Sequence, residues 1–209
     1  MKAIAAREDI RDLILEATDR LLARYGYRKM TMDDVAQEVG IGKGTIYVHF
    51  SSKEEVALCR IDRVVEQMNE QLSVIAHNGK PATDRLRQML LVRVLYRFDK
   101  VQHYKESLSD VLATIRPALL ARRERHFDQE ARIFAEVLKE GGRTGALVFS
   151  DALATAHTLL VATNSLLPYN LSPRELGARK LIEEQTERIA NMLLHGLLKA
   201  ETQLQRRKK

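Results

Sequence analysis

Residues 26–55 contain caps, apolar positions and glycines in the order that two short helices joined by a tight turn require. Thr31 can cap the first helix, and Asp34 three residues later has the spacing of a capping box. The next apolar positions repeat at helical spacing and end before Gly40, which favours the left-handed backbone of a helix exit. This segment therefore predicts a helix-turn-helix unit.

The second helix of this unit is expected from about Lys43 to Phe50. At about 100° per residue, Ile46 and Phe50 fall on one side and are the expected buried anchors. The opposite arc carries Gly44, Thr45, Val48 and His49. A helical glycine costs about 1 kcal/mol relative to alanine, so Gly44 favours close approach of another surface, although a flexible glycine-rich loop is the alternative.

A third helix is expected from Ser52, because Ser52 and Glu55 repeat the capping-box spacing. Lys53 lies in its first turn, where a cation opposes the helix dipole. We interpret this as a position for a bound anion such as a phosphate.

The remaining sequence predicts an all-α protein with about nine helices and no strand. A first helix contains Ile10 and ends at Gly26, and a helix around residues 89–98 is apolar on nearly all sides, as expected of a central one. The other ranges expected to be helical are 52–77, 101–115, 117–140, 150–167 and a final helix opened by Ser172 and Pro173.

The residues of the first segment resemble the DNA-binding segment of TetR-type transcriptional regulators. The resemblance is carried by Thr31, Val35-Ala36, Gly40-Ile41, Gly44-Thr45-Ile46-Tyr47, His49-Phe50 and Ser52-Lys53-Glu54. It implies a DNA-binding domain over residues 1–54 and an effector-binding and dimerisation domain over 55–209. Gly42 departs from the family pattern, which usually has a serine or similar residue as the cap of the recognition helix.

Net charge does not by itself predict DNA binding. The chain has a formal charge of +6, but residues 1–55 hold nine Lys and Arg against ten Asp and Glu. The excess of positive charge thus lies outside the expected DNA-binding domain, which we call the head. Binding is predicted from motif geometry, with local cations such as Lys43 and Lys53.

Position and resemblance together suggest roles at double-stranded DNA. Lys43, at the start of the recognition helix, is the candidate for base readout, and Thr45 for a base or phosphate contact. Gly44 would admit the DNA backbone. The resemblance implies phosphate contacts from Thr31, Tyr47, His49 and Lys53. Packing of Tyr47 over the head's own core and a solvated His49 are the alternatives.

The last two helices have the small and apolar residues of a dimer interface. The resemblance implies that they form a four-helix bundle between two subunits, and two recognition helices about 34–36 Å apart would then match a two-fold symmetric operator. The residues expected at this interface are Leu153, His157, Leu160, Ile189, Met192 and Leu193. The alternative is that the small and apolar residues of both helices pack into the core of their own subunit.

The resemblance also implies a small-molecule effector cavity among the middle helices. Candidate lining residues are Met89, Arg93, Tyr96, Arg97, Tyr104, Phe127 and Phe134. Arg93 and Arg97 lie one turn apart and can receive an anionic group, whereas Glu106 and Asp110 would suit a cation. Core packing of the aromatics and a solvated arginine stripe are the alternatives.

No enzyme class finds support in the sequence. The histidines have no recognised zinc spacing, so no metal or cofactor is expected, and Cys59 has no identifiable base beside it. A charged N-terminus and the single cysteine favour a cytoplasmic protein without a membrane span. The sequence therefore predicts a regulator, most simply a repressor released by its effector; an activator, or control by a protein partner, remains open. A helix-turn-helix used only for packing is a third alternative.

Overall fold

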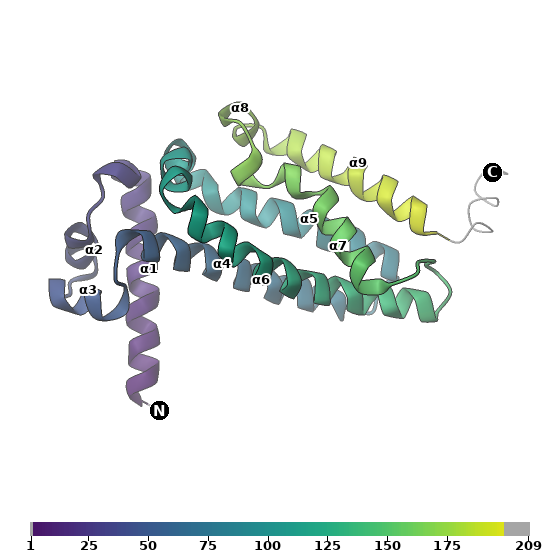
Figure 1. Cartoon of the computed structure of the whole chain (residues 1–209), viewed down its shortest axis with the longest axis horizontal. Coiled ribbons are helices and arrows are strands. Elements are labelled where there is room, and N and C mark those ends of the chain that lie inside the picture. The colour runs from purple at the N-terminus through teal and green to yellow at the C-terminus, as the bar shows by residue number, and fades with distance from the viewer. Residues whose placement is uncertain (1, 199–209) are drawn as a thin grey trace. The chain divides into compact units, whose positions relative to one another are not determined.

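A computed structural model describes residues 2–198 of the 209-residue chain, with side chains from residue 10 onward. Its order is α1 (Lys2–Lys29), α2 (Met32–Val39), α3 (Lys43–His49), α4 (Lys53–Ala76), α5 (Ala82–Val101), η1 (Gln102–Ser107), α6 (Leu108–Arg143), α7 (Ala152–Ala162), η2 (Asn164–Leu166), η3 (Pro168–Asn170), α8 (Pro173–Leu176) and α9 (Arg179–Leu197), where η marks a 3-10 helix (Figure 1). The predicted all-α class is confirmed. Between residues 2 and 198 the only β-type pairing is an isolated bridge from Leu147 to Leu198.

The chain divides into two compact units. The N-terminal unit comprises the chain as far as Val64 together with Lys100–Ala121, and the C-terminal unit comprises Val65–Asp99 and the chain from Arg122 onward. The division therefore falls within α4, α5 and α6. The functional boundary expected between residues 54 and 55 remains a prediction.

In the N-terminal unit, α2 packs against both α1 and α3. Gly26 interrupts α1 with a positive φ of 75°, as its predicted role at a helix end requires. A Cβ built on Gly26 would lie 2.8 Å from Ser107 Oγ, so this position also requires the absence of a side chain.

The C-terminal unit is built around one apolar core, to which α4, α5, α6, α7 and α9 all contribute. The central position of α5 is confirmed, because its apolar side chains are almost completely buried: Leu86, Met89, Leu90, Val94 and Phe98. Helix α9 runs beside α7 (Figure 1). None of the described helices is both long and apolar enough to cross a membrane.

The predicted break between residues 115 and 117 is wrong, because α6 continues through Pro117. Proline has no N–H, so the carbonyl of Ala113, four residues earlier, lacks its helical donor. Both Pro117 and Ala113 are exposed, which lets water satisfy that carbonyl. A surface proline thus leaves the helix continuous.

The predicted ends around α7 and α9 also need correction. Helix α7 ends at Ala162 rather than near 167, where the Thr163 hydroxyl donates toward the carbonyls of Leu159 and Leu160. The predicted cap and capping box at Ser172 are confirmed, but they open only the single turn of α8. Gly177 ends that turn, and α9 begins at Arg179.

Candidate functional site

The capping box that opens α2 is formed as predicted. Thr31 Oγ1 accepts from the Asp34 N–H at 3.1 Å, and Asp34 Oδ2 accepts from the Thr31 N–H at 2.8 Å. The hydrogen bonds from Thr31 lower the pKa of the Asp34 carboxyl. Two otherwise unpaired amides are thereby satisfied, and the start of α2 is fixed.

The turn between α2 and α3 depends on Gly40. Its φ of 78° is the predicted left-handed conformation, and its N–H donates back to carbonyls of α2. Gly42 then precedes α3 in extended backbone without a side-chain cap, as its sequence predicts. The turn is thus set by backbone geometry at Gly40.

The predicted anchors of α3 are confirmed, since Ile46 and Phe50 are almost completely buried. Arg11 of α1 strengthens the end of this helix: its guanidinium lies 4.5 Å from the centre of the Phe50 ring and donates to the His49 carbonyl at 3.1 Å. Sequence reasoning missed Arg11, because these partners lie 38 or more residues away and leave no local pattern.

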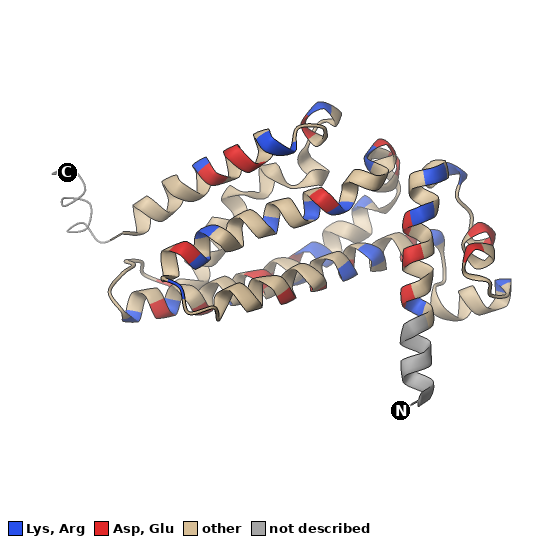
Figure 2. Ribbon diagram, turned by 180° about the vertical axis from the view of Figure 1, so that it is seen from behind, with Lys and Arg blue, Asp and Glu red and all other residues tan. Residues whose placement is uncertain are grey.

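The outer face of α3 is open and carries one charged side chain. Lys43 and Gly44 are exposed, Tyr47 and Val48 retain 47% and 64% exposure, and Thr45 is half-buried. In Figure 2 this helix is tan except at Lys43, whereas the start of α2 carries the acidic Asp33 and Asp34. The exposure of Tyr47 disfavours the alternative that its ring covers the core.

His49 does not lie on this open face, contrary to the predicted arc. Its side chain is only 8% exposed. The helix ends here, and Phe50 is already extended with φ −142°. A regular 100° step therefore does not describe the surroundings of the last helical side chain.

Lys43 is paired within the protein. Its Nζ donates to Asp33 Oδ2 at 2.8 Å, and both side chains are more than half exposed. This hydrogen bond raises the pKa of the Lys43 ammonium. An exposed pair of this kind contributes little stability, so another hydrogen-bond acceptor can replace Asp33 at low cost.

Lys53 joins the start of α4 to the segment before α2. Its Nζ donates to the carbonyls of Tyr27 at 3.0 Å and Met30 at 3.1 Å, and lies 4.4 Å from the centre of the Tyr27 ring. An ammonium has three N–H groups, so one remains for an outside acceptor. Burial and the neighbouring Glu54 raise the pKa of Tyr27 to about 12, so its hydroxyl stays neutral.

The segment that contains these features matches a known family. Residues 14–58 fit the model of the bacterial regulatory proteins, tetR family. Residues 14–58 therefore form a segment of the tetR family type. EthR of Mycobacterium tuberculosis is 42% identical over 79 residues, which are 37% of this chain and 36% of EthR. The transcriptional activator FasR of Mycolicibacterium smegmatis is 32% identical over 97 residues, or 46% and 42% of the two chains.

The chain therefore spans less than half of the length of these curated relatives. Over the whole chain, the similarity is one of fold. A TetR-family transcriptional regulator of Pectobacterium atrosepticum superposes with a TM-score of 0.70 and 18% identity, covering 93% of this chain and 96% of that one.

The residues expected to line a TetR-type effector cavity lie in different environments. Met89 and Phe134 are completely buried in the core of the C-terminal unit, while Phe127 and Tyr96 pack at its edge. The Tyr96 hydroxyl donates to Gln67 at 3.0 Å. Tyr104 belongs to the N-terminal unit, where its hydroxyl accepts from the buried Arg60.

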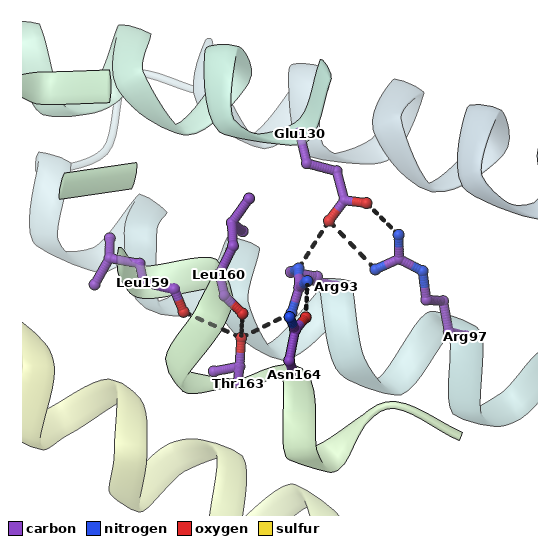
Figure 3. Close-up of polar contacts among 7 residues, drawn as sticks. All are labelled: Arg93, Arg97, Glu130, Leu159, Leu160, Thr163 and Asn164. Atoms are coloured by element: carbon purple, nitrogen blue, oxygen red, sulfur yellow. Dashed lines mark hydrogen bonds and ion pairs between the residues drawn. The ribbon is translucent and has the colours of Figure 1, made fainter. Parts of the chain in front are cut away.

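Arg93 and Arg97 both meet Glu130, which sequence reasoning did not name as a site residue (Figure 3). The predicted pair of arginines on one side of α5 is thus present, but it does not form a solvated stripe. Arg93 is 1% exposed, and Glu130 comes from α6, 37 residues along the chain. Within residues 10–198, no group of three His, Cys, Asp or Glu side chains forms a possible metal site.

The residues expected at the TetR-type dimer interface divide between surface and core. Leu153 and Met192 are exposed, and His157, Ile189 and Leu193 are partly buried. Leu160 was predicted at the interface, but it lies in the protomer's own core with no exposure, as the alternative interpretation expected. Val161 is exposed instead, and its spacing of four from His157 was the available sequence signal.

Proposed function

We propose that this protein is a ligand-responsive transcriptional regulator that binds a two-fold symmetric operator as a homodimer. The observation that carries the proposal is α3, held by the buried Ile46 and Phe50 while Lys43, Gly44 and Tyr47 remain open. A helix presented in this way can enter the major groove with its first turn against the base edges.

Within this interface, Lys43 reads bases and Lys53 binds the phosphate backbone. Lys43 lies in the first turn of α3. On binding DNA, its ammonium leaves the exposed carboxylate of Asp33 and donates to an acceptor atom of a guanine. Lys53 keeps one N–H for a phosphate while its other two hold the carbonyls of Tyr27 and Met30. Thr31, Thr45 and Tyr47 supply hydroxyls at the same surface, whereas the buried ring of His49 is less suited to the phosphate contact suggested for it.

Lys43→Ala is expected to reduce sequence preference, while Lys53→Ala weakens binding to all sequences alike. Losing a base contact costs about 1–3 kcal/mol on the preferred site only, which is about 5- to 150-fold. The measurement selects bound sites from random DNA and then compares the best site with an unrelated duplex by gel shift at fixed salt.

Lys80→Ala, which changes an exposed lysine of the C-terminal unit, is the control for loss of charge alone. Unfolding temperatures of both variants separate DNA contacts from the loss of the Lys53 carbonyl bonds. Equal loss of preference in the two variants would contradict the division of roles. Failure to select any site, at low as well as moderate salt, would favour a packing role for the motif.

Dimerisation is proposed through the outer faces of α7 and α9. Leu153, His157 and Val161 follow one another at four-residue spacing, and Met192 is 77% exposed. Helix α7 and residues 189–197 of α9 contain no Lys, Arg, Asp or Glu, so both stretches are tan in Figure 2. An uncharged face with these exposed apolar side chains favours a self-complementary contact.

Met192→Glu is expected to shift the protein from dimer to monomer at micromolar concentration, because two-fold symmetry brings two new carboxylates into one contact. The exposed position of Met192 leaves the protomer fold intact. Light scattering after size-exclusion chromatography gives the mass. Val148→Glu, at a second exposed apolar position with 57% exposure, is the control. An unchanged dimer in Met192→Glu would place the interface elsewhere.

Regulation is proposed to work by population shift. An effector that binds better to a conformation whose two heads do not match the operator must lower operator affinity. Titration of one ligand against the other tests this, and independent binding contradicts it. An increase in affinity would contradict release by the effector. The proposed site of action is the cytoplasm.

A further inference from the structure

Arg93 is the centre of a hydrogen-bonded cluster in the C-terminal unit. Its Nε donates to Glu130 at 2.7 Å, one terminal nitrogen donates to the Thr163 hydroxyl at 2.8 Å, and the other donates to the Asn164 side chain at 2.8 Å (Figure 3). Each of its three nitrogens therefore has a partner. Arg93 joins α5, α6 and the end of α7, and this is a structural role.

Arg97 has a different set of bonds. Both of its terminal nitrogens face the carboxylate of Glu130, and its Nε takes no part in these bonds (Figure 3). Its side chain retains 11% exposure, against 1% for Arg93 and 2% for Glu130. A guanidinium has five N–H groups, so Arg97 keeps donor capacity at the edge of the cluster.

The cluster of Arg93, Arg97 and Glu130 has a net charge of +1. Two guanidinium groups share the single carboxylate of Glu130, and the charges acting on Arg93 are those of Glu130, Arg97 and the Tyr169 phenol. Burial raises the pKa of Tyr169, so this hydroxyl stays neutral and cannot supply the missing negative charge. Arg93 and Glu130 alone would form a neutral buried pair; Arg97 adds an excess that a dry environment disfavours.

We infer that Arg97 binds the carboxylate of an organic anion, which completes the charge balance of the cluster. The phenol of Tyr169 lies in the field of Arg97, Arg93 and a third arginine, Arg123. Phe127, with its ring centre 5.9 Å from the Arg93 guanidinium carbon, supplies an apolar neighbour. A guanidinium binds a carboxylate through paired N–H groups. The inference deepens the proposed function, on which it rests for its regulatory meaning, by assigning the chemical class of the effector.

Arg97→Gln tests this assignment first without any ligand. Removal of the excess charge leaves the neutral Arg93–Glu130 pair, so the variant should unfold at the wild-type temperature or above. If Arg97 served only as a structural ion-pair partner, its loss would lower the unfolding temperature by about 6 °C or more, and that result would overturn the inference. Arg179→Gln, which removes an exposed arginine paired with Asp99 in the same unit, is the matched control.

The second measurement adds probes. Octanoate, acetate and inorganic phosphate are compared with octanol and with chloride at equal ionic strength. Octanoate should raise the unfolding temperature of the wild type and of Arg179→Gln by about 5–10 °C at one hundred times its Kd, and should not do so in Arg97→Gln. A larger rise with phosphate than with either carboxylate, an equal rise with octanol, or a rise that survives Arg97→Gln would each overturn the carboxylate assignment.

Gel shifts on a selected DNA site separate this inference from the proposed function. Octanoate binding that depends on Arg97 but leaves DNA affinity unchanged supports the site and contradicts effector release. DNA binding without Arg97-dependent anion binding supports the DNA-binding part of the proposed function and contradicts the site.

Discussion

Glu130→Gln is expected to lower the free energy of unfolding by about 3–5 kcal/mol, which is the usual cost of removing one partner from a buried ion pair. The glutamine would leave Arg93 and Arg97 in the core of the C-terminal unit without a negative charge. Arg93 cannot turn toward water, because it is 1% exposed and is also held by Thr163 and Asn164. Urea unfolding followed by circular dichroism at pH 7 measures the change.

The pH dependence of this difference follows from Glu130. Burial raises the pKa of its carboxyl, but Arg97 and Arg93 outweigh burial, so the folded-state pKa lies below the ordinary value of 4.5. The unfolded chain therefore binds the proton first as the pH falls. The stability contributed by Glu130 is complete above the unfolded-state pKa and is lost as the pH falls through the folded-state pKa.

The difference in the free energy of unfolding between wild type and Glu130→Gln should accordingly narrow as the pH falls below about 4.5, because the unfolded wild-type chain then gains a proton that the folded carboxyl takes up only at lower pH. Glu183→Gln is the control, since Glu183 is only partly buried and pairs with Arg179 at the surface of the same unit. Its loss should cost less than about 1 kcal/mol. Equal costs for the two variants, or a gap that is constant with pH, would show that the carboxylate is not the neutralising charge.

The contrast between Glu130 and Thr31 explains which parts of the molecule the sequence can predict. Thr31 and Asp34 are three residues apart, so their capping box follows from local geometry and could be predicted. Arg93 meets Glu130 across 37 residues and Thr163 across 70 residues. The local spacing of residues cannot predict such long-range pairs. From the sequence alone, a stripe of solvated arginines was therefore a reasonable interpretation of Arg93 and Arg97.

The same reasoning applies to the helix ends. Proline propensity predicted a break at Pro117, but the break depends on whether water can reach the carbonyl of Ala113, which is a property of the folded surface. The position of His49 was assigned by a regular helical step that the chain abandons at Phe50. Local sequence rules thus predict helix caps well. They do not predict the packing around the last residue of a helix.

Gly44 gives the second large effect, in which stability and DNA affinity move in opposite directions. A Cβ built on Gly44 meets nothing within 4 Å, and the residue is exposed in the first turn of α3. Alanine there should therefore stabilise the N-terminal unit by up to about 1 kcal/mol through helix propensity. If the DNA backbone approaches this position, the added side chain must also push the DNA away.

Gly44→Ala and Gly44→Leu form a size series that separates these effects. The affinity for a selected operator should fall with side-chain volume, by at least about tenfold for leucine, or 1.4 kcal/mol. The unfolding temperature should not fall in either variant, because a Cβ at Gly44 meets no protein atom within 4 Å and the position is exposed to solvent. Gel shift and thermal unfolding on the same preparations make the comparison.

The directions in which the unfolding temperature and the operator affinity change decide the role of Gly44. A flexible loop would lose nothing in DNA affinity when the helix is stabilised, and a glycine required by protein packing would make both variants less stable. Only a surface approached closely by DNA predicts a protein that is more stable and binds less well. If operator affinity is unchanged in Gly44→Leu, α3 does not lie in the major groove. That result would contradict the proposed mode of DNA binding.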